Sequence, residues 1–377
     1  MTLVDWIFWS TASLVAYTYV GYPLLVGALA LLREPIFPPA LGDDELPEVT
    51  VLMAAHNEAH RLPSKLDNLL SQDFPAGRVQ ILIVSDGSTD DTEGLAAARP
   101  DVRVLVSPER RGKASALNLG MAAVTTDVVV LCDVRQELAP SALRHLVSDL
   151  MDPRVGAVSG ELMHRSAATA AAGNIGLYWR YEKFIRKAES RLHSTPGATG
   201  ALFAMHRRDW QPLPAGTILD DFETPMHVVR KGGRVLLDPR AVAWDDLQEH
   251  AQGERRRKIR TLGGNYQSFA RNPWLFVPWR NPLWWQFLSH KVLRLVAPYA
   301  LLSCFLSSLL GGGPYLTVAA WLQGAFYAAA LFGYLFPGAR RHRVVSFAHV
   351  FCDMNFAAVV ALLRFASGGL DARWEKT

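Results

Sequence analysis

The feature that most constrains this chain is a stretch from Trp6 to Leu32 that contains no charged side chain. The stretch is 27 residues long, whereas a helix needs about 20 apolar residues to cross the hydrocarbon core of a bilayer. No basic residue precedes it, and the first one after it is Arg33, which is the reverse of the order in a secretory signal peptide. We therefore expect a retained membrane anchor over residues 1–33.

Three further apolar stretches lie near the end of the chain, at Val292–Leu310, Tyr315–Phe336 and Val344–Ala366. Between the last two lies a strongly basic connector, Arg340–Arg343, and such loops stay on the cytoplasmic side of a membrane. Counting spans from this loop places the middle of the chain in the cytoplasm and the tail Asp371–Thr377 outside. The last stretch contains Asp353, and a charge is costly in a bilayer. A re-entrant or groove-lining helix is therefore the alternative to a span there.

These apolar runs predict four parts. Residues 1–33 form the anchor, 34–253 a cytosolic domain, 254–290 a basic interfacial segment, and 291–377 a membrane region of about three helices. The predicted location is the inner cell membrane, crossed several times. The three cysteines, Cys132, Cys304 and Cys352, are widely spaced and show neither a disulfide nor a metal-binding pattern.

The middle of the chain alternates short apolar runs with amphipathic stretches of helix length. The runs are Val49–Ala54, Val79–Ser85, Val102–Val106, Asp127–Leu131 and Val155–Ser159. The expected helices are Arg61–Gln72, Asp91–Ala98, Lys113–Val124 and Ser141–Met151. This alternation predicts an α/β domain with a mostly parallel sheet, and ligands of such sheets collect at the carboxyl ends of the strands.

Polar residues follow several of these runs. They are His56-Asn57-Glu58, Ser85-Asp86-Gly87, Cys132-Asp133-Val134-Arg135 and, before a helix, Arg110-Arg111-Gly112-Lys113. Carboxylates, a glycine turn and basic side chains should therefore converge at one edge of the sheet. This combination suits a polyanionic ligand rich in hydroxyl groups, such as a nucleotide diphosphate-sugar.

Five motifs in order, AAHNE, SDGSTDDT, RRGKASALN, LCDVRQ and LDDFE, make the chain resemble family 2 glycosyltransferases from about Val49 to Arg260. That group contains the cellulose, chitin, hyaluronan and poly-N-acetylglucosamine synthases. The resemblance implies a Rossmann-like GT-A fold, a nucleotide-sugar donor and inversion at the transferred sugar.

The resemblance also implies the donor contacts. Asp86 corresponds to the residue that hydrogen-bonds uracil, and Asn57 and Glu58 to residues beside the base and ribose. Capping of the following helix is the alternative for Asn57 and Glu58, and a tight turn for Asp86. Lys113 begins a helix, where backbone N–H groups and the helix dipole favour phosphate. A solvated surface lysine is the alternative there.

Asp133 matches the first carboxylate of the family's Asp-x-Asp element, which holds Mg²⁺ or Mn²⁺ against the diphosphate. Oxygen ligands suit both ions, and Mg²⁺ is often held by one or two carboxylates plus phosphates. Arg135 stands where the second Asp is usual. We expect its guanidinium to pair with phosphate or with Glu137, and a strand-end turn is the alternative role for Asp133.

Asp220-Asp221 falls where the family has Thr-Glu-Asp, with Asp221 at the position of the catalytic base. A carboxylate that takes the proton of the acceptor hydroxyl accelerates such a transfer by about 10²–10⁴-fold. Asp220, Gly200 and Ala201 are expected on the acceptor side. Helix capping is the alternative for Asp220, and core packing for the apolar residues after Ala201.

The family's Gln-x-x-Arg-Trp motif is replaced here by a basic run that ends in Arg260-Thr261. Arg257 and Arg260 are expected to contact the donor, while the loss of the aromatic residue argues against long processive synthesis. From Arg255 to Arg294 there is no acidic residue, which is typical of helices on an anionic membrane surface. No nucleic-acid-binding motif accompanies these cations, so a nucleic-acid partner is not expected.

The expected function is transfer from a UDP-sugar, UDP-N-acetylglucosamine or UDP-glucose, to a growing β-linked exopolysaccharide or oligosaccharide. Membrane lipids and polysaccharide-export proteins are the expected partners. One alternative is a single-sugar transferase that acts on a polyprenyl-phosphate or lipid-linked acceptor. The other is an inactive membrane partner in a polysaccharide assembly complex.

Overall fold

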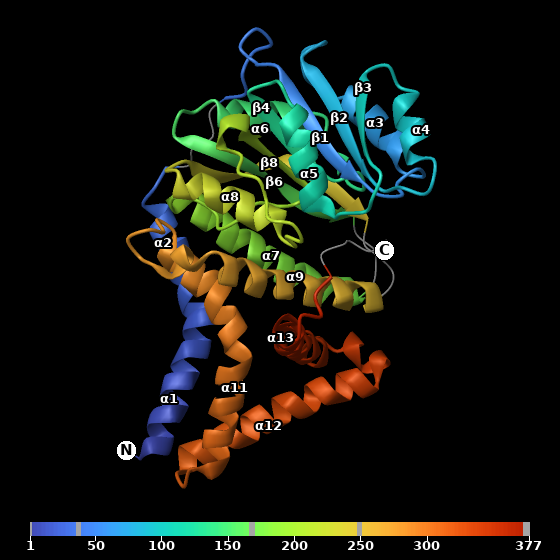
Figure 1. Cartoon of the computed structure of the whole chain (residues 1–377). Coiled ribbons are helices and arrows are strands. Elements are labelled where there is room, and N and C mark those ends of the chain that lie inside the picture. Colours follow the sequence, from blue (N-terminus) through green and yellow to red (C-terminus); the bar gives the residue numbers. More distant parts are fainter. Residues whose placement is uncertain (1, 35–38, 166–169, 247–250, 372–377) are drawn as a thin grey trace.

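The structure, a computed structural model, describes residues 2–34, 39–165, 170–246 and 251–371. Its α/β domain contains eight strands, which are β1 (Val49–Ala55), β2 (Val79–Asp86), β3 (Val102–Ser107), β4 (Val128–Cys132), β5 (Glu137–Leu138), β6 (Val155–Arg165), β7 (Leu202–His206) and β8 (Arg234–Asp246). They form one sheet in the order β3-β2-β1-β4-β7-β6-β8-β5 (Figure 1).

Most neighbouring strands run parallel, as predicted. β1 pairs in parallel with β2 and β4, β2 with β3, and β6 with β8. β7 runs antiparallel to β4 and β6, and β5 runs antiparallel to β8. The five predicted strands are present, although β6 continues to Arg165 rather than ending at Ser159. The sequence analysis did not predict β5, β7 or β8.

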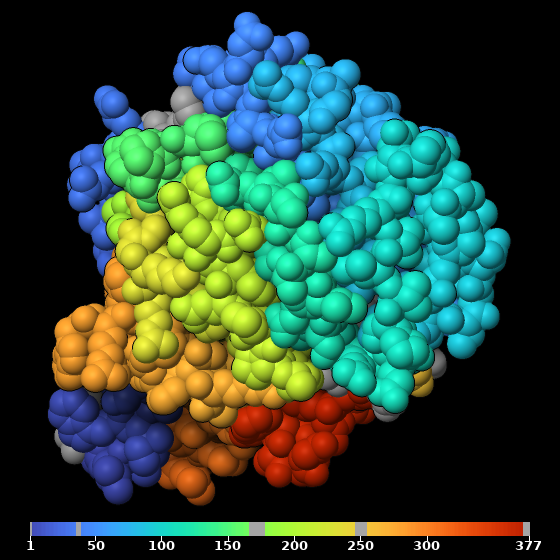
Figure 2. Space-filling model, turned by 45° about the horizontal axis from the view of Figure 1, so that its top comes forward, coloured from blue at the N-terminus to red at the C-terminus, as the bar shows by residue number. Residues whose placement is uncertain are grey.

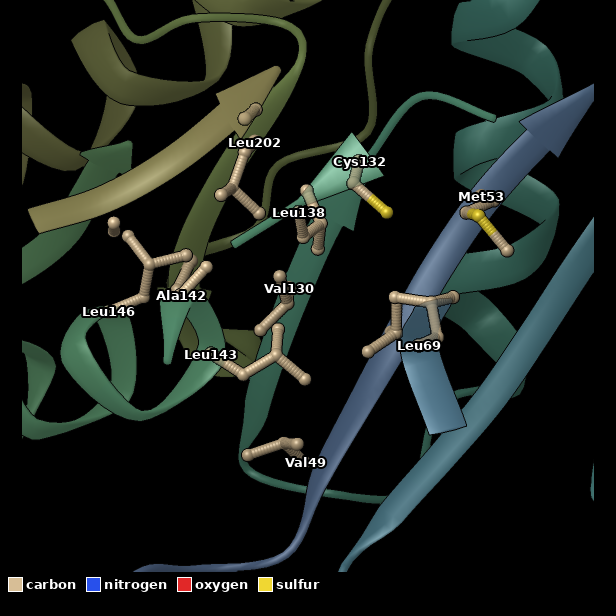
Figure 3. Close-up of a cluster of buried hydrophobic side chains, with 14 of the residues drawn as sticks. Val49, Met53, Leu69, Val130, Cys132, Leu138, Ala142, Leu143, Leu146 and Leu202 are labelled. Atoms are coloured by element: carbon tan, nitrogen blue, oxygen red, sulfur yellow. The ribbon is translucent and has the colours of Figure 1, made fainter. Parts of the chain in front are cut away.

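Helices cover both faces of this sheet, which explains why the strands are apolar on both sides. The five helices are α3 (Leu62–Leu70), α4 (Thr92–Ala97), α5 (Lys113–Ala123), α6 (Ala142–Leu150) and α8 (Asp220–Arg230). Met53 of β1 packs in one buried cluster with Leu69 and Leu146 from α3 and α6 (Figure 3). The preceding residue of β1, Leu52, belongs to the buried cluster on the other face of the sheet, together with Phe222 of α8.

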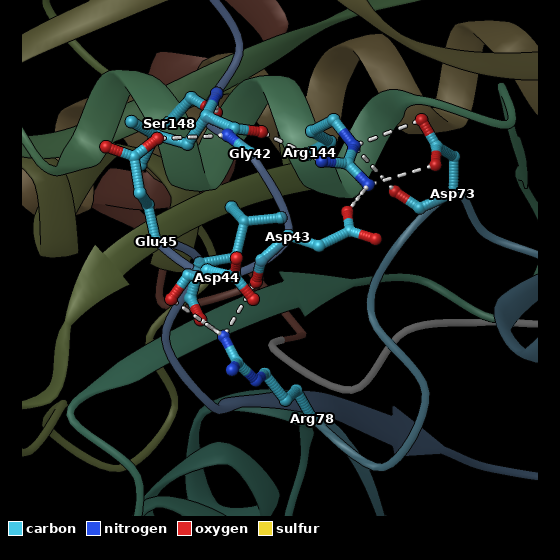
Figure 4. Close-up of polar contacts among 10 residues, drawn as sticks. Gly42, Asp43, Asp44, Glu45, Asp73, Arg78, Arg144 and Ser148 are labelled. Carbon is cyan, nitrogen blue, oxygen red and sulfur yellow. Dashed lines mark hydrogen bonds and ion pairs between the residues drawn. The ribbon is translucent and has the colours of Figure 1, made fainter.

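The segment between the N-terminal anchor and β1 is fixed to the domain by two arginines (Figure 4). Arg144 of α6 donates to the Leu41 carbonyl at 2.8 Å and to Asp43 Oδ1 at 2.6 Å. Arg78 donates to the Asp43 carbonyl at 2.8 Å and to the Leu46 carbonyl. This part of the connection is therefore a bound strap rather than a free linker.

Four helical stretches among the described residues are long and apolar enough to cross a membrane, namely Leu3–Leu31, Trp284–Leu310, Pro314–Leu335 and Arg343–Ala366. The first consists of α1 (Leu3–Ala16), a π-helical turn (Tyr17–Gly21) and α2 (Tyr22–Leu31). The second consists of α10 (Trp284–Gln286), a π-helical turn (Phe287–Val292) and α11 (Leu293–Leu310). The last two are α12 (Pro314–Leu335) and α13 (Arg343–Ala366).

Two amphipathic helices, α7 (Ala170–Leu192) and α9 (Ala251–Arg271), lie between the sheet and these apolar helices (Figure 1). α1 and α11 pack side by side and point away from the α/β domain, and α12 leads back toward it. In the space-filling view the α/β domain rests as one body on the orange and red C-terminal helices (Figure 2).

α13 runs across the direction of α1 and α11, since Figure 1 shows it almost end-on beneath α9. The turn before α13, Pro337–Arg341, contacts α7, and Leu370 after α13 packs against Gly263 of α9. Both ends of α13 therefore lie on the side of the α/β domain. Asp353 lies 3.6 Å from Arg255 of α9, which gives the charge in this apolar helix a partner. This packing favours the re-entrant alternative for α13, while the side on which the tail begins stays a prediction, and residues 372–377 of that tail lie outside the described residues.

Candidate functional site

The loops after β1, β2 and β4 meet at one edge of the sheet, with Asp86 at their centre. Its carboxylate is fully buried and accepts hydrogen bonds from the backbone N–H groups of Arg111 and Gly112, both at 2.8 Å. Gly112 has φ +91°, a left-handed conformation that glycine adopts without strain. Asp86 thus fixes the loop that starts α5 at Lys113. Its contact with a nucleotide base stays a prediction.

Asn57 ties the loop after β1 to the loop after β2. It has φ 55°, and its side-chain oxygen accepts hydrogen bonds from Thr89 N at 2.6 Å and Asp90 N at 3.3 Å. The Glu58 backbone N–H donates to Thr92 Oγ1 at 2.8 Å. The two predicted pocket residues thus lie beside the Asp86 loop, but they bind the protein itself here. Their role toward a donor stays a prediction.

Lys113 connects two acidic segments that are distant in sequence. Its Nζ lies 2.9 Å from Asp133 Oδ1, after β4, and 3.1 Å from Asp220 Oδ2, at the start of α8. Burial would lower the pKa of Lys113, but Asp133 and Asp220 outweigh it and raise that pKa well above its usual range. Lys113 is therefore held charged at the carboxyl edge of the sheet, which excludes the solvated surface lysine that was its alternative.

Asp221 lies beside this ion-pair network. Its Oδ2 accepts a hydrogen bond from Gly200 N at 3.1 Å, and a Cβ at Gly200 would lie 3.1 Å from the same oxygen. Burial and the neighbouring Asp220 raise the pKa of Asp221 to about 6, although Lys113 and Lys291 act in the opposite direction. The pKa of this half-buried carboxylate therefore lies close to neutral pH, which suits a general base.

Gly200 and Ala201, which were predicted on the acceptor side, lie beside Asp221 and Asp133. The Asp133 backbone N–H donates to the Ala201 carbonyl at 3.4 Å, so β7 brings the Ala201 segment to the end of β4. The next two residues, Leu202 and Phe203, are buried in the core, as the alternative reading held. Contact of Gly200 and Ala201 with an acceptor stays a prediction.

The charge of Arg260 of α9 interacts with the same acidic group. Burial lowers the pKa of Arg260, while Asp220, Asp221, Asp371 and Asp133 act in the opposite direction. Its contact with a donor stays a prediction. The charge of Arg257, with that of Arg135, acts on His164 of β6, whose pKa is lowered mainly by burial. Contact of Arg257 with a donor stays a prediction.

Arg135 was expected to pair with phosphate or with Glu137; the pair with Glu137 is absent among the described residues, and a contact with phosphate stays a prediction. Its guanidinium lies 2.5 Å from Asp245 Oδ2 of β8, and Glu137 instead pairs with Arg165 at 2.6 Å. The reason is the antiparallel pairing of β5 with β8, which brings Asp245 opposite the segment that follows Asp133. The sequence analysis missed Asp245 because β8 itself was not predicted.

A divalent ion would find few protein ligands at this edge. Within the part of the chain that the structure describes, no group of three or more His, Cys, Asp or Glu residues could hold a metal ion. Asp133 is 39 % exposed on its side chain and shares one oxygen with Lys113. Its other oxygen suits an ion that takes its remaining ligands from donor phosphates and water, as Mg²⁺ sites commonly do.

Comparisons with known proteins fit this geometry. Residues 50–211 match the family model described as glycosyl transferase family 2. The poly-beta-1,6-N-acetyl-D-glucosamine synthase of Staphylococcus aureus (strain COL) is 25 % identical over 244 residues, which are 62 % of this chain and 58 % of that protein. The probable glycosyltransferase YdaM of Bacillus subtilis (strain 168) is 27 % identical over 245 residues, 59 % of this chain and 56 % of YdaM. The matched region thus spans less than two thirds of these curated relatives.

A solved structure covers more of the chain. The mannosyltransferase PcManGT from Pyrobaculum calidifontis, in complex with GDP-Man and Mn²⁺, superposes with a TM-score of 0.73 at 26 % identity. The superposition covers 97 % of this chain and 99 % of PcManGT. The GT-A type of sheet with apolar helices toward both ends is thereby confirmed.

Proposed function

Because the chain belongs to glycosyl transferase family 2 through residues 50–211, we propose that it is a membrane glycosyltransferase. It would transfer one sugar from a nucleotide-sugar donor to a saccharide acceptor, with inversion at the anomeric carbon. The observation that carries this proposal is the group of Lys113, Asp133, Asp220 and Asp221 at one edge of the sheet.

Asp221 is the proposed base. In the reaction, the acceptor hydroxyl oxygen forms a bond to the anomeric carbon while the bond from that carbon to the diphosphate oxygen breaks. The electron pair leaves with the nucleoside diphosphate, and the hydroxyl proton passes to Asp221. The hydrogen bond from Gly200 N to Asp221 Oδ2 orients the carboxylate for this role.

Lys113 and Arg260 are the proposed cations for the departing diphosphate. Cations fixed where negative charge develops stabilise the transition state without reorganisation during the reaction. Asp133 would hold a Mg²⁺ or Mn²⁺ ion together with the donor phosphates, and that ion would neutralise part of the diphosphate charge. A diphosphate at this edge would also give Lys113 a partner that competes with Asp220.

The donor sugar is the finer part of the proposal. We favour UDP-N-acetylglucosamine or UDP-glucose because the Staphylococcus relative is named a poly-beta-1,6-N-acetyl-D-glucosamine synthase. GDP-mannose is the rival donor because PcManGT is a mannosyltransferase solved with GDP-Man. The product would be a β-linked oligosaccharide or exopolysaccharide, with export proteins as partners of a polymer-forming enzyme.

We place the α/β domain on the cytoplasmic side of the inner membrane. The turn that carries Arg340 and Arg341 contacts α7 and thus lies on the same side as the α/β domain. Basic connectors of this kind stay in the cytoplasm, so the proposed orientation gives the site access to cytoplasmic nucleotide sugars.

The test uses the purified full-length protein in detergent with UDP-N-acetylglucosamine, UDP-glucose and GDP-mannose, each supplied with Mg²⁺ or Mn²⁺. We expect release of the nucleoside diphosphate from one donor and a product whose mass rises by whole sugar units. One added unit would identify a single-sugar transferase and many units a polymerase. Failure of all three donors to release diphosphate or to form product would overturn the proposed donor class.

Asp221→Asn supplies the matched control, because it keeps the shape of the side chain but removes the proton acceptor. We expect transfer to fall at least about 100-fold while donor binding remains measurable. An Asp221→Asn protein with unchanged turnover would remove Asp221 from the role of base and leave the donor assignment standing.

A further inference from the structure

Two cations lie on the membrane side of Asp221 and have no role in the proposed transfer so far. Lys291, in the π-helical turn before α11, has its Nζ 5.7 Å from the centroid of the Phe222 ring, and its charge acts on the Asp221 carboxyl. Arg186 of α7 donates to Ser159 Oγ at 3.3 Å. Burial lowers the pKa of Arg186, and Glu189, Glu182 and Asp221 act in the opposite direction.

Neither cation has an ion pair among the residues that the structure describes. The acidic side chains nearby are already engaged by other groups: Glu182 by Arg294 and by His290 at 3.1 Å, Glu189 by Tyr22 and by His290 at 2.8 Å, and Glu161 by Lys183 at 3.1 Å and Lys187 at 3.0 Å. Apart from Asp221, Arg186 and Lys291 thus face carboxylates that are already paired, which leaves positive charge available for a bound anion.

These two cations are separate from the donor-side cations. Lys113 and Arg260 act on Asp133 and Asp220, whereas Lys291 and Arg186 act on one another and on Glu182 and Glu189 of α7. Asp221 is the group that both sets share. Ser159 Oγ, which Arg186 contacts, also accepts a hydrogen bond from Thr199 N at 2.9 Å, and Lys291 lies over the ring of Phe222, the residue after Asp221. The two cations therefore border the segment around Gly200 and Asp221, which is the predicted acceptor side.

The position of Lys291 favours an anion that belongs to the membrane. Lys291 lies in the helical stretch Trp284–Leu310, which is long and apolar enough to cross a bilayer. It is near the beginning of that stretch, at the end next to the α/β domain. Lipid phosphates lie at this level of a membrane, and arginine and lysine are the side chains that bind phosphate most often.

We propose that Arg186 and Lys291 bind the phosphate of a lipid-linked saccharide acceptor and thereby present a hydroxyl of its sugar to Asp221. This inference rests on the proposed transferase function and names the acceptor class for the same site. The bond between lipid phosphate and acceptor sugar stays intact. The new bond joins the acceptor hydroxyl oxygen to the donor's anomeric carbon, the nucleoside diphosphate leaves with the electron pair, and Asp221 takes the proton.

The experiment compares two acceptors that differ in the linkage between the sugar and the lipid, which is charged in one and neutral in the other. Both carry the same sugar and the same prenyl chain, joined in one through a diphosphate and in the other through a neutral ether. We expect the wild-type protein to have an acceptor KM about tenfold or more lower for the diphosphate form, since a charged hydrogen bond to phosphate is about that strong. Lys291→Gln and Arg186→Gln should each raise the KM for the diphosphate acceptor alone.

Lys187→Gln is the matched control, because Lys187 is on the same helix as Arg186 but is more exposed and paired with Glu161. We expect it to leave both acceptor KM values unchanged, and Lys291→Arg to retain most of the preference. For every variant we also measure how fast the donor releases nucleoside diphosphate when no acceptor is present. A rate at the wild-type level shows that the fold and the donor site are intact. A sugar 1-phosphate without lipid should inhibit only weakly, because it lacks the membrane anchor.

Equal use of the two acceptors by the wild-type protein would overturn the inference and leave the transferase function standing. So would a preference for the diphosphate form that survives in both Lys291→Gln and Arg186→Gln, or inhibition by the free sugar 1-phosphate as strong as that by the lipid form. If the wild-type protein released no nucleoside diphosphate from any donor, that result would instead count against the proposed function itself.

Discussion

At the scale of single residues, the protonation state of Asp221 is set by opposing neighbours. Burial and Asp220 raise its pKa to about 6, and Lys113 and Lys291 limit the increase. A base must be ionised to accept a proton, so turnover should rise about tenfold per pH unit up to pH 6 and level off above it. The pH profile of kcat with saturating donor and acceptor measures this.

Lys113→Gln provides the check on that assignment. Because Lys113 holds the pKa of Asp221 down, its removal should move the acid limb of the profile to higher pH, whatever it does to donor affinity. An acid limb near pH 4 in the wild-type protein, or one that does not move in Lys113→Gln, would contradict the assignment of the limb to Asp221.

Gly200 lies so close to the Asp221 carboxylate that there is little room for a side chain at position 200. In Gly200→Ala the new Cβ would lie 3.1 Å from Asp221 Oδ2 and 3.6 Å from its Cβ, closer than ordinary van der Waals contact with the oxygen. The carboxylate must then turn away, and we expect kcat to fall at least about tenfold, because misplacement of a catalytic group by a fraction of an ångström is costly.

Thermal unfolding should change little in Gly200→Ala, since the collision is with one half-buried side chain. Gly324→Ala is the control, because a Cβ there meets no atom within 4 Å, and its activity should stay at the wild-type level. An unchanged kcat in Gly200→Ala would show that the position of Asp221 Oδ2 does not limit the reaction.

At the scale of elements, the strap before β1 connects the N-terminal membrane helix to the sheet. Arg144 holds it through Leu41 and Asp43 and also binds Asp73 at 3.0 Å. We expect Arg144→Ala to reduce the free energy of unfolding by about 1–2 kcal/mol and to expose the strap to proteases. The shift in the thermal midpoint and the site of first cleavage measure these two effects.

Arg154→Ala is the comparison, because Arg154 is exposed and its ion pair, among the residues that the structure describes, is with Asp152, two residues away. Exposed pairs of this kind contribute little to stability, so neither the midpoint nor the cleavage pattern should change. Equal behaviour of the two variants would show that the strap does not depend on Arg144.

The elements that the sequence predicted are those whose signal is local. Buried runs such as Val49–Ala55 and the polar residues after them could be placed because strand and helix alternate at regular spacing. β7 could not be placed, since its antiparallel position between β4 and β6 depends on tertiary pairing. The candidate site shows the same limit. Sequence motifs located Lys113 and Asp133, but no pattern in the sequence indicated Arg186, which we propose to bind the acceptor.

At the scale of the whole molecule, one polar layer joins the catalytic edge to the membrane helices. α7 contacts α2 and β8, and α9 contacts α13, so the two amphipathic helices connect the sheet with the apolar helices. Arg260 and Arg255 illustrate this on α9, since the charge of the first interacts with the acidic site and the second pairs with Asp353 of α13. Arg255 thus links α9 to α13, while the prediction that most of the basic run serves the membrane surface stays a prediction.

The course of α13 decides the topology of the chain. If α13 lies across the membrane surface, only Leu3–Leu31, Trp284–Leu310 and Pro314–Leu335 cross the bilayer. An odd number of crossings puts the N-terminus and the end of α13 on opposite sides, with the turn between α11 and α12 outside.

Single cysteines can test this arrangement in intact cells with a membrane-impermeant thiol reagent. We expect Gly312→Cys, in the turn between α11 and α12, to react from outside, and Ser367→Cys, after α13, to react only once the membrane is permeabilised. The wild-type protein gives the background, because Cys132 and Cys304 are buried and Cys352 is half-buried. Reaction of Ser367→Cys from outside in intact cells would mean that α13 crosses the bilayer, contrary to the arrangement that we infer from the packing of Leu370 on Gly263. Because Leu370 packs on Gly263, the side of the membrane on which Ser367 reacts also tests how the α/β domain is attached to the apolar helices.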